Sequence, residues 1–127
     1  MTIGKTAKNV AYVYTRDPAK SKAFYGATLG FAIKGEDKFA VKLDFNGAEL
    51  RIVPIPDHNP HAHPIFGWEV PDVAATVKAL SAKGVKMNVY DGMGQDELGI
   101  WTSPDGKTKI AFFNDPDGNG LSIATHR

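Results

Sequence analysis

The hydrophobic pattern of the chain begins with a stretch of period two. Residues 9–15 are rich in aromatic and β-branched side chains, and Val10, Tyr12 and Tyr14 alternate with the residues between them. This pattern predicts a strand. Asp17-Pro18 then combines a preferred N-cap with a proline at the first helical position, and Gly30 is a typical C-cap. A helix is therefore predicted between them. Its expected apolar stripe consists of Ala19, Ala23, Phe24 and Ala27.

Three short strands are predicted after this helix, over about residues 31–34, 39–45 and 48–54. Asn46-Gly47 joins the last two strands. This dipeptide favours a type I′ hairpin turn, because both central residues of that turn need a positive φ. The next segment, residues 54–64, contains four prolines and three histidines, so we predict that it is a linker.

The same order of elements then repeats. Residues 65–70 are predicted to form a strand, and Asp72 caps a second helix that ends at Gly84. The apolar stripe of this helix is Val73, Val77 and Leu80. Further strands are predicted near residues 85–90, 99–102, 109–114 and 120–125.

The two halves match at the residues that begin and end their elements. Asp17 corresponds to Asp72, and Asn46-Gly47 corresponds to Asp117-Gly118. The sequence therefore predicts a single α+β domain over residues 1–127, made of two strand–helix–three-strand modules. Module one covers about 7–54, the linker about 55–64 and module two about 65–127. A duplicated unit whose sheet curls round a hollow is a natural place for a small-molecule pocket.

Composition narrows the classes of function. The chain has no cysteine, which excludes disulfides, zinc–thiolate sites and a cysteine nucleophile. Its net charge is +1 and no basic stretch stands out, so neither nucleic acid nor an anionic membrane is expected as a partner. No apolar run approaches the roughly 20 residues of a membrane span. The first residues lead into no signal-like segment, and the expected location is the cytoplasm.

Four motifs, in their order and spacing, carry a resemblance to a known family. They are Asp17-Pro18-Ala19-Lys20-Ser21-Lys22-Ala23-Phe24-Tyr25, Leu29-Gly30-Phe31, Val70-Pro71-Asp72-Val73 and Phe113-Asn114-Asp115-Pro116-Asp117-Gly118-Asn119. Over nearly its whole length the chain resembles the glyoxalase/bleomycin resistance protein family, also called the vicinal oxygen chelate (VOC) superfamily. The segment 99–106 resembles a subgroup of small single-domain members whose activities are mostly unassigned.

The resemblance implies the glyoxalase/bleomycin resistance/dihydroxybiphenyl dioxygenase fold, in which two βαβββ modules form an open, barrel-like cavity. It also implies a homodimer. Metal-dependent members of the family place four ligands in the cavity. Two are histidines seven residues before the Asp that opens each helix, and two are glutamates or equivalents on the last strand of each module.

In this chain the four corresponding positions hold Val10, Ile65, Arg51 and Ser122. Divalent cations need several carboxylate, imidazole or similar donors, and an arginine repels them. We therefore expect no metal cofactor at the usual positions.

Strand alternation predicts which side chains share the cavity face with these positions. Tyr12 and Tyr14 offer flat faces with a polar tip for an aromatic ligand, although such residues are commonly structural. Arg51 can hold an anionic group, or it can pair with a carboxylate such as Glu49 or Glu69. Glu69 can act as a general base or anchor a cationic group, or it can be ion-paired or simply exposed.

Other candidates are weaker. Trp101 can stack on a planar ligand or pack in the core, and its face is not fixed by the sequence. The cluster of Asp57, His58, His61 and His63 has the composition of a metal site but lies in the linker. A displaced divalent metal site using His63 and Glu69 is the alternative to a metal-free cavity.

Two functions follow from these residues. The first is a metal-independent protein that binds or sequesters a small, partly aromatic or charged compound through Tyr12, Tyr14, Arg51, Glu69, Trp101 and Ser122. The alternative is a VOC-type enzyme, a lyase, isomerase or dioxygenase. Such an enzyme would be metal-free with Glu69 as base, or would use the displaced metal site.

Overall fold

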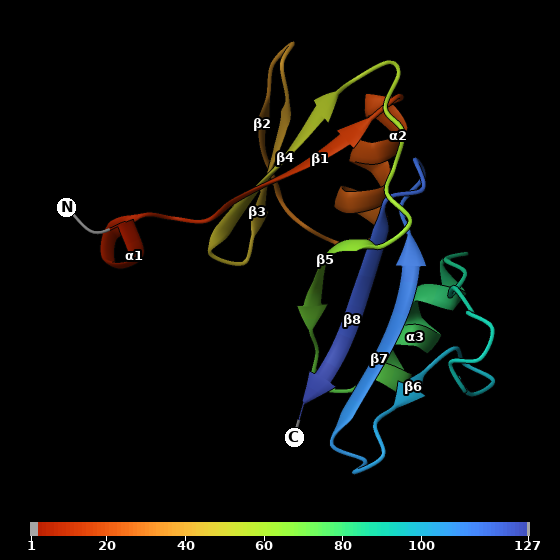
Figure 1. The fold of residues 1–127 in the computed structure, drawn as a ribbon. Coiled ribbons are helices and arrows are strands. Elements are labelled where there is room, and N and C mark those ends of the chain that lie inside the picture. Colours follow the sequence, from red (N-terminus) through yellow and green to blue (C-terminus); the bar gives the residue numbers. More distant parts are fainter. Residues whose placement is uncertain (1–2, 127) are drawn as a thin grey trace. The chain divides into compact units, whose positions relative to one another are not determined.

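The computed structural model describes residues 3–126 of the chain. The chain folds into two compact units. The first extends to Asn59, and the second begins at Pro60. Each unit contains one four-stranded sheet and a helix that packs on it (Figure 1). Among residues 3–126, no helix has the length and apolar character that crossing a membrane requires.

The first unit has the strand order β1-β4-β3-β2, with β1 and β4 parallel and the other pairs antiparallel. The first strand, β1, is therefore at one edge of the sheet, and the last strand, β4, lies between β1 and β3. Its elements are α1 (Ile3–Thr6), β1 (Val10–Thr15), α2 (Pro18–Ala23), the π-helix η1 (Phe24–Thr28), β2 (Ile33–Glu36), β3 (Val41–Phe45) and β4 (Ala48–Pro54).

The second unit repeats this topology with the order β5-β8-β7-β6, and β5 and β8 are again parallel. The predicted α+β class with two βαβββ modules is confirmed. Its elements are β5 (Pro64–Glu69), α3 (Val73–Ala82), β6 (Trp101–Thr102), β7 (Thr108–Asn114) and β8 (Gly120–His126).

Burial alternates along the strands of each sheet as the sequence pattern predicts. In the first unit Val13, Leu50 and Ile52 are fully buried, whereas Tyr12 and Tyr14 are 50% and 41% exposed. In the second unit Leu121 and Phe113 are fully buried. Trp68 stacks on Phe113 with 6.4 Å between ring centroids. One face of each sheet therefore supplies the core, and the opposite face is left for other contacts.

The two helices differ in how well the sequence predicted their buried faces. Asp72 caps α3 by accepting the N–H of Ala75 at 3.1 Å, and Val73, Val77 and Leu80 are buried, as expected. The stripe predicted for the first helix is wrong: Ala19, Ala23 and Ala27 are exposed, and Ser21 and Tyr25 are buried. The helix widens into the π-helix η1 at Phe24, and the large ring of Tyr25 contributes more apolar area than three methyl groups.

The strand predicted over residues 85–90 is also wrong. This segment makes only an isolated bridge between Met87 and Phe113. The side chain of Gln95 takes the place of a partner strand: its Oε1 accepts from Tyr90 N–H at 2.7 Å, and its Nε2 donates to the carbonyls of Asn88 and Gly99 at 2.9 and 2.7 Å. A polar side chain thus satisfies backbone groups that the sequence pattern assigned to a ladder.

The hairpins of the two modules use different turn chemistry. Asn46 and Gly47 have φ of 55° and 96°, as the type I′ prediction requires. The longer turn at residues 115–119 is built round a buried carboxylate. Asp115 Oδ1 accepts the N–H groups of Asp117 and Asn119, each at 2.9 Å, and Asp115 Oδ2 accepts from Asn119 Nδ2 at 2.8 Å. This network fixes the start of β8.

We expect Asp115→Ala to destabilise the protein by about 2–4 kcal/mol, because it leaves buried N–H groups without an acceptor. The matched control is Asp105→Ala, which removes a carboxylate that accepts from Lys107 N–H and Ser103 Oγ in an exposed turn. This control should cost less, since water replaces the lost acceptor. Equal shifts of the urea midpoint in the two variants would contradict the structural role assigned to Asp115.

Candidate functional site

The face of each sheet that lies opposite its helix carries the predicted site residues, and we call it the open face of that module. In the first module it includes Tyr12, Tyr14 and Arg51, because these alternate with the buried Val13 and Ile52. In the second module it includes Glu69 and Ser122, which alternate with Trp68 and Ile123. The structure thus places these five residues on the sheet face that strand alternation predicted for them.

Arg51 lies at the centre of the first open face. Arg51 pairs with Tyr12 on β1 and Lys42 on β3, and its Cζ lies 5.9 Å from the centre of the Tyr12 ring. Its Nε donates to Glu49 Oε2 at 2.5 Å, and Lys34 Nζ lies 3.2 Å from the other oxygen of Glu49. Of the two roles considered for Arg51, pairing with Glu49 is therefore observed. The terminal nitrogens of the guanidinium remain the part suited to a ligand.

This ion cluster shifts the pKa of both partners in the expected directions. The hydrogen bond from Arg51, followed by that from Lys34, lowers the pKa of Glu49 below its ordinary value of 4.5. The hydrogen bond to Glu49 raises the pKa of Arg51. Both groups are charged at neutral pH, so the first open face presents a fixed cation beside two tyrosine rings.

The second open face can be followed across the whole sheet. Trp101 pairs with Ile110, Ile110 with Ala124, and Ala124 with Glu69. Directly paired residues point to the same face of a sheet, so Trp101 lies on the open face together with Glu69. The sequence could not assign this side chain, because its face depends on a register that passes through three strands.

The next row of the same face contains Gly67, Ser122 and Phe112. A Cβ atom at Gly67 would lie 2.1 Å from Ser122 Oγ and 2.5 Å from its carbonyl oxygen, so β5 and β8 approach too closely for any larger residue. Phe112 meets the edge of Tyr90 at 5.6 Å between ring centroids. The open face of module two is therefore apolar at its centre, with a hydroxyl and a carboxylate among the apolar side chains.

The strand pairing also tests which residues of the two modules correspond. Arg51 pairs with Tyr12, five residues before Asp17, and Ser122 pairs with Gly67, five residues before Asp72. Arg51 and Ser122 thus occupy equivalent positions of the repeat. The guanidinium of Arg51 repels a divalent cation, and a serine hydroxyl by itself is too weak a ligand to hold one.

A sequence profile of the Glyoxalase/Bleomycin resistance protein/Dioxygenase superfamily matches residues 3–123. The chain belongs to this superfamily. The chain is 31% identical over 133 residues to the uncharacterized protein YaeR of Escherichia coli (strain K12). The match covers 94% of this chain and 95% of YaeR.

Two solved structures illustrate the fold that the superfamily shares. The bleomycin resistance determinant encoded on transposon Tn5 is 21% identical with a TM-score of 0.72, over 96% of this chain and 99% of that one. Lactoylglutathione lyase from Agrobacterium tumefaciens is 17% identical with a TM-score of 0.71, over 94% and 92% of the two chains. At such identities the likeness concerns the fold alone.

The two residues considered for a displaced metal site in this VOC-superfamily chain, His63 and Glu69, lie at opposite ends of β5. His63 directly precedes β5 and Glu69 ends it, so the extended strand separates them by about 20 Å. One ion cannot reach both side chains. Within each unit of the part that the structure describes, no three His, Asp or Glu side chains are grouped so that they could hold a metal ion. His58 belongs to the first unit, where its ring lies 5.7 Å from that of Tyr14.

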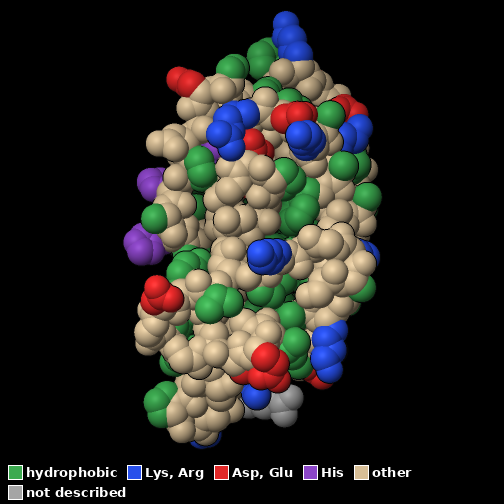
Figure 2. All heavy atoms as spheres, turned by 90° about the vertical axis from the view of Figure 1, so that its right-hand side faces the viewer, with side chains coloured by type: hydrophobic (Ala, Val, Ile, Leu, Met, Phe, Trp, Pro, Cys, Tyr) green, Lys and Arg blue, Asp and Glu red, His purple; other side chains and the backbone are tan. Residues whose placement is uncertain are grey.

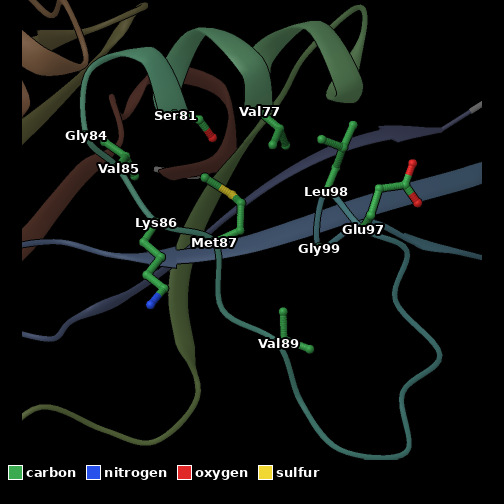
Figure 3. Close-up of a pocket in the computed structure, with 10 residues that line it drawn as sticks. All are labelled: Val77, Ser81, Gly84, Val85, Lys86, Met87, Val89, Glu97, Leu98 and Gly99. Atoms are coloured by element: carbon green, nitrogen blue, oxygen red, sulfur yellow. The ribbon is translucent and has the colours of Figure 1, made fainter.

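Two pockets in module two border residues 85–90, a segment that the sequence analysis did not assign to a functional site. A pocket of about 350 Å³ lies between α3 and residues 85–99; Figure 3 shows Val77, Met87 and Leu98 pointing into it. A second pocket of about 490 Å³ is lined by Asn88 and Tyr90, among others. The sequence does hint at this role: residues 85–90 read Val-Lys-Met-Asn-Val-Tyr, and this alternation is typical of an extended segment with an apolar and a polar face.

The distribution of charge is consistent with the composition. On the face drawn in Figure 2, Lys and Arg side chains are interspersed with Asp and Glu. That face offers no basic stripe of the kind that binds nucleic acid.

Replacing Arg51 by Met should raise the pKa of Glu49 towards its ordinary value, because the largest cause of the lowered pKa is removed. A folded-state pKa below the unfolded one stabilises the protein above the unfolded value, and this stabilisation is lost as the pH falls through the folded value. Carboxyl NMR titration measures the change. Lys42→Met is the control: it removes a cation beside Arg51 and should leave Glu49 unchanged. An unaltered Glu49 titration in Arg51→Met would contradict the assigned pairing.

Proposed function

We propose that this protein binds a small, partly aromatic or charged organic molecule on the open faces of its modules, without the metal site of its metal-dependent relatives. The observation that carries this proposal is the row of Trp101, Ile110 and Ala124 that ends in Glu69. Ala124 is buried, whereas Trp101 and Ile110 stay half-buried on the sheet face opposite the helix, where their apolar surface is open to a ligand.

The chemistry of both faces supports a small-molecule ligand. Ligand sites are commonly lined by apolar and aromatic side chains with a few polar groups that fix orientation. Trp101 and Phe112 supply flat apolar surfaces in module two, and Ser122 supplies a hydroxyl. In module one Tyr12 and the guanidinium of Arg51 offer an aromatic face and a fork of N–H donors.

The superfamily gives this proposal its context. One solved structure of the same fold is a bleomycin resistance determinant, and a resistance protein without catalysis acts by binding. We extend this to a metal-independent binder that works in the cytoplasm as a homodimer, the commonest closed assembly of soluble chains.

NMR titration of isotope-labelled protein with naphthalenemethanol, a neutral planar probe, tests the proposal. We expect a saturable shift of the Trp101 indole N–H, because that ring lies on the open face. The indole of Trp68 is an internal control, since its ring stacks on the buried Phe113 and should respond little. Trp101→Phe identifies the two indole signals. Equal small shifts of both indoles, without saturation, would rule out a site on this face.

A second candidate function is a metal-free enzyme with Glu69 as general base. The observation in its favour is that Glu69 is exposed at the end of β5 and makes no ion pair within the described residues of its own module. A carboxylate that is not engaged structurally can accept a proton from a bound substrate.

Glu69→Gln separates the two functions. For a binder, the affinity for naphthalenemethanol should stay within about threefold of the original, because a neutral probe gains little from the carboxylate charge. Lactoylglutathione, named by one relative of the same fold, serves as the test substrate, and we expect no turnover of it. Turnover that falls by about 100-fold or more in Glu69→Gln would instead establish the enzyme.

A further inference from the structure

The segment of residues 85–90 alternates apolar and polar side chains and borders two pockets. Figure 3 shows Met87 directed towards α3, whereas the amine of Lys86 extends away from that helix. Asn88 and Tyr90 line only the pocket of about 490 Å³, whereas Lys86, Met87 and Val89 border both this pocket and the one beside α3. We call the pocket of about 490 Å³ the polar cleft.

The lining of the polar cleft is rich in hydrogen-bond donors. It combines the ammonium of Lys86, the imidazole of His61, the hydroxyl of Tyr90 and the amides of Asn88 and Asn114, and no Asp or Glu lines it. Asn88 Nδ2 donates to Asn114 Oδ1 at 2.8 Å, so Asn114 uses its oxygen within the pair and keeps its amide N–H groups for other acceptors. Donors without a matching carboxylate favour an anion.

The polar cleft adjoins the open face of module two. Asn114 pairs with Gly120, two residues along from the row of Phe112 and Ser122 and therefore about 7 Å away on the same face. The contact between Tyr90 and Phe112 joins the two regions directly. A molecule of modest size can reach both.

We infer that the polar cleft binds the anionic group, a carboxylate, of a ligand whose apolar part lies over Phe112, Ile110 and Trp101. This inference rests on the proposed binding function and names the class of ligand, an aromatic or aliphatic organic acid. Lys86 supplies the charge, and the Asn88–Asn114 pair and Tyr90 supply the orientation.

Naphthoate and naphthalenemethanol have the same ring system, and only naphthoate carries a charge. NMR titrations should give naphthoate about a tenfold lower Kd, the worth of one charge-assisted hydrogen bond. Backbone amides of Asn114, Gly118 and Gly120 should shift with naphthoate but not with the alcohol, while the Trp101 indole responds to both.

Three variants complete the test. Lys86→Met should remove the advantage of naphthoate, and Lys86→Arg should keep it. Lys107→Met makes the same change of charge at an exposed turn outside the polar cleft and should also keep it. Both positions, Lys86 and Lys107, are exposed, so we expect the variants to fold.

The possible outcomes distinguish a failure of the anion site from a failure of the proposed binding function. If both probes bind equally through Trp101, the anion site is wrong and the binding function stands. If Lys86→Met and Lys107→Met weaken naphthoate equally, the effect is one of net charge and the anion site is likewise overturned. If neither probe binds at the open face, the inference and the proposed function fail together.

Discussion

The parallel pairing of the first and last strands within each module is the constraint on which the site depends. It puts Arg51 beside Tyr12 in one module and Ser122 beside Gly67 in the other. At Gly67 the approach leaves no room for a Cβ atom, so the register of β5 and β8 cannot slip without a clash. Since a slip of one residue turns every side chain to the other face, this contact also determines which groups a ligand meets.

The parts of the fold that could be predicted from sequence are those encoded locally. Asp72 with its apolar stripe and Asn46-Gly47 with its positive φ values specify their own geometry. The failures involve a side-chain partner outside the predicted element or a change of helical period. Gln95 satisfies the backbone of residues 88–90 from outside that segment. The π-helix after Ala23 rotates Tyr25 into the core, which a period of 3.6 does not anticipate.

The candidate site also has a part that the local sequence predicts and a part that depends on the fold. Alternation alone placed Glu69 and Ser122 on one face, because the parity of a strand is a local property. Trp101 required the register of β6, β7 and β8, and the polar cleft required residues from four separate segments. A short polar residue such as Asn88 gives no signal of its own. It becomes a candidate only when folding puts Asn114 and Lys86 beside it.

Each module, taken by itself, carries cationic side chains that suit the anionic ligand we propose. In module one the resemblance to metal-dependent members implies that Arg51 stands at one of their ligand positions, and a guanidinium repels a divalent ion. Glu49 neutralises part of that charge but is itself shared with Lys34. In module two Lys86 and His61 border the polar cleft without an acidic neighbour among its lining residues. In the function that we propose, the N–H donors of these residues hold a charged oxygen atom, and no metal ion is needed for that contact.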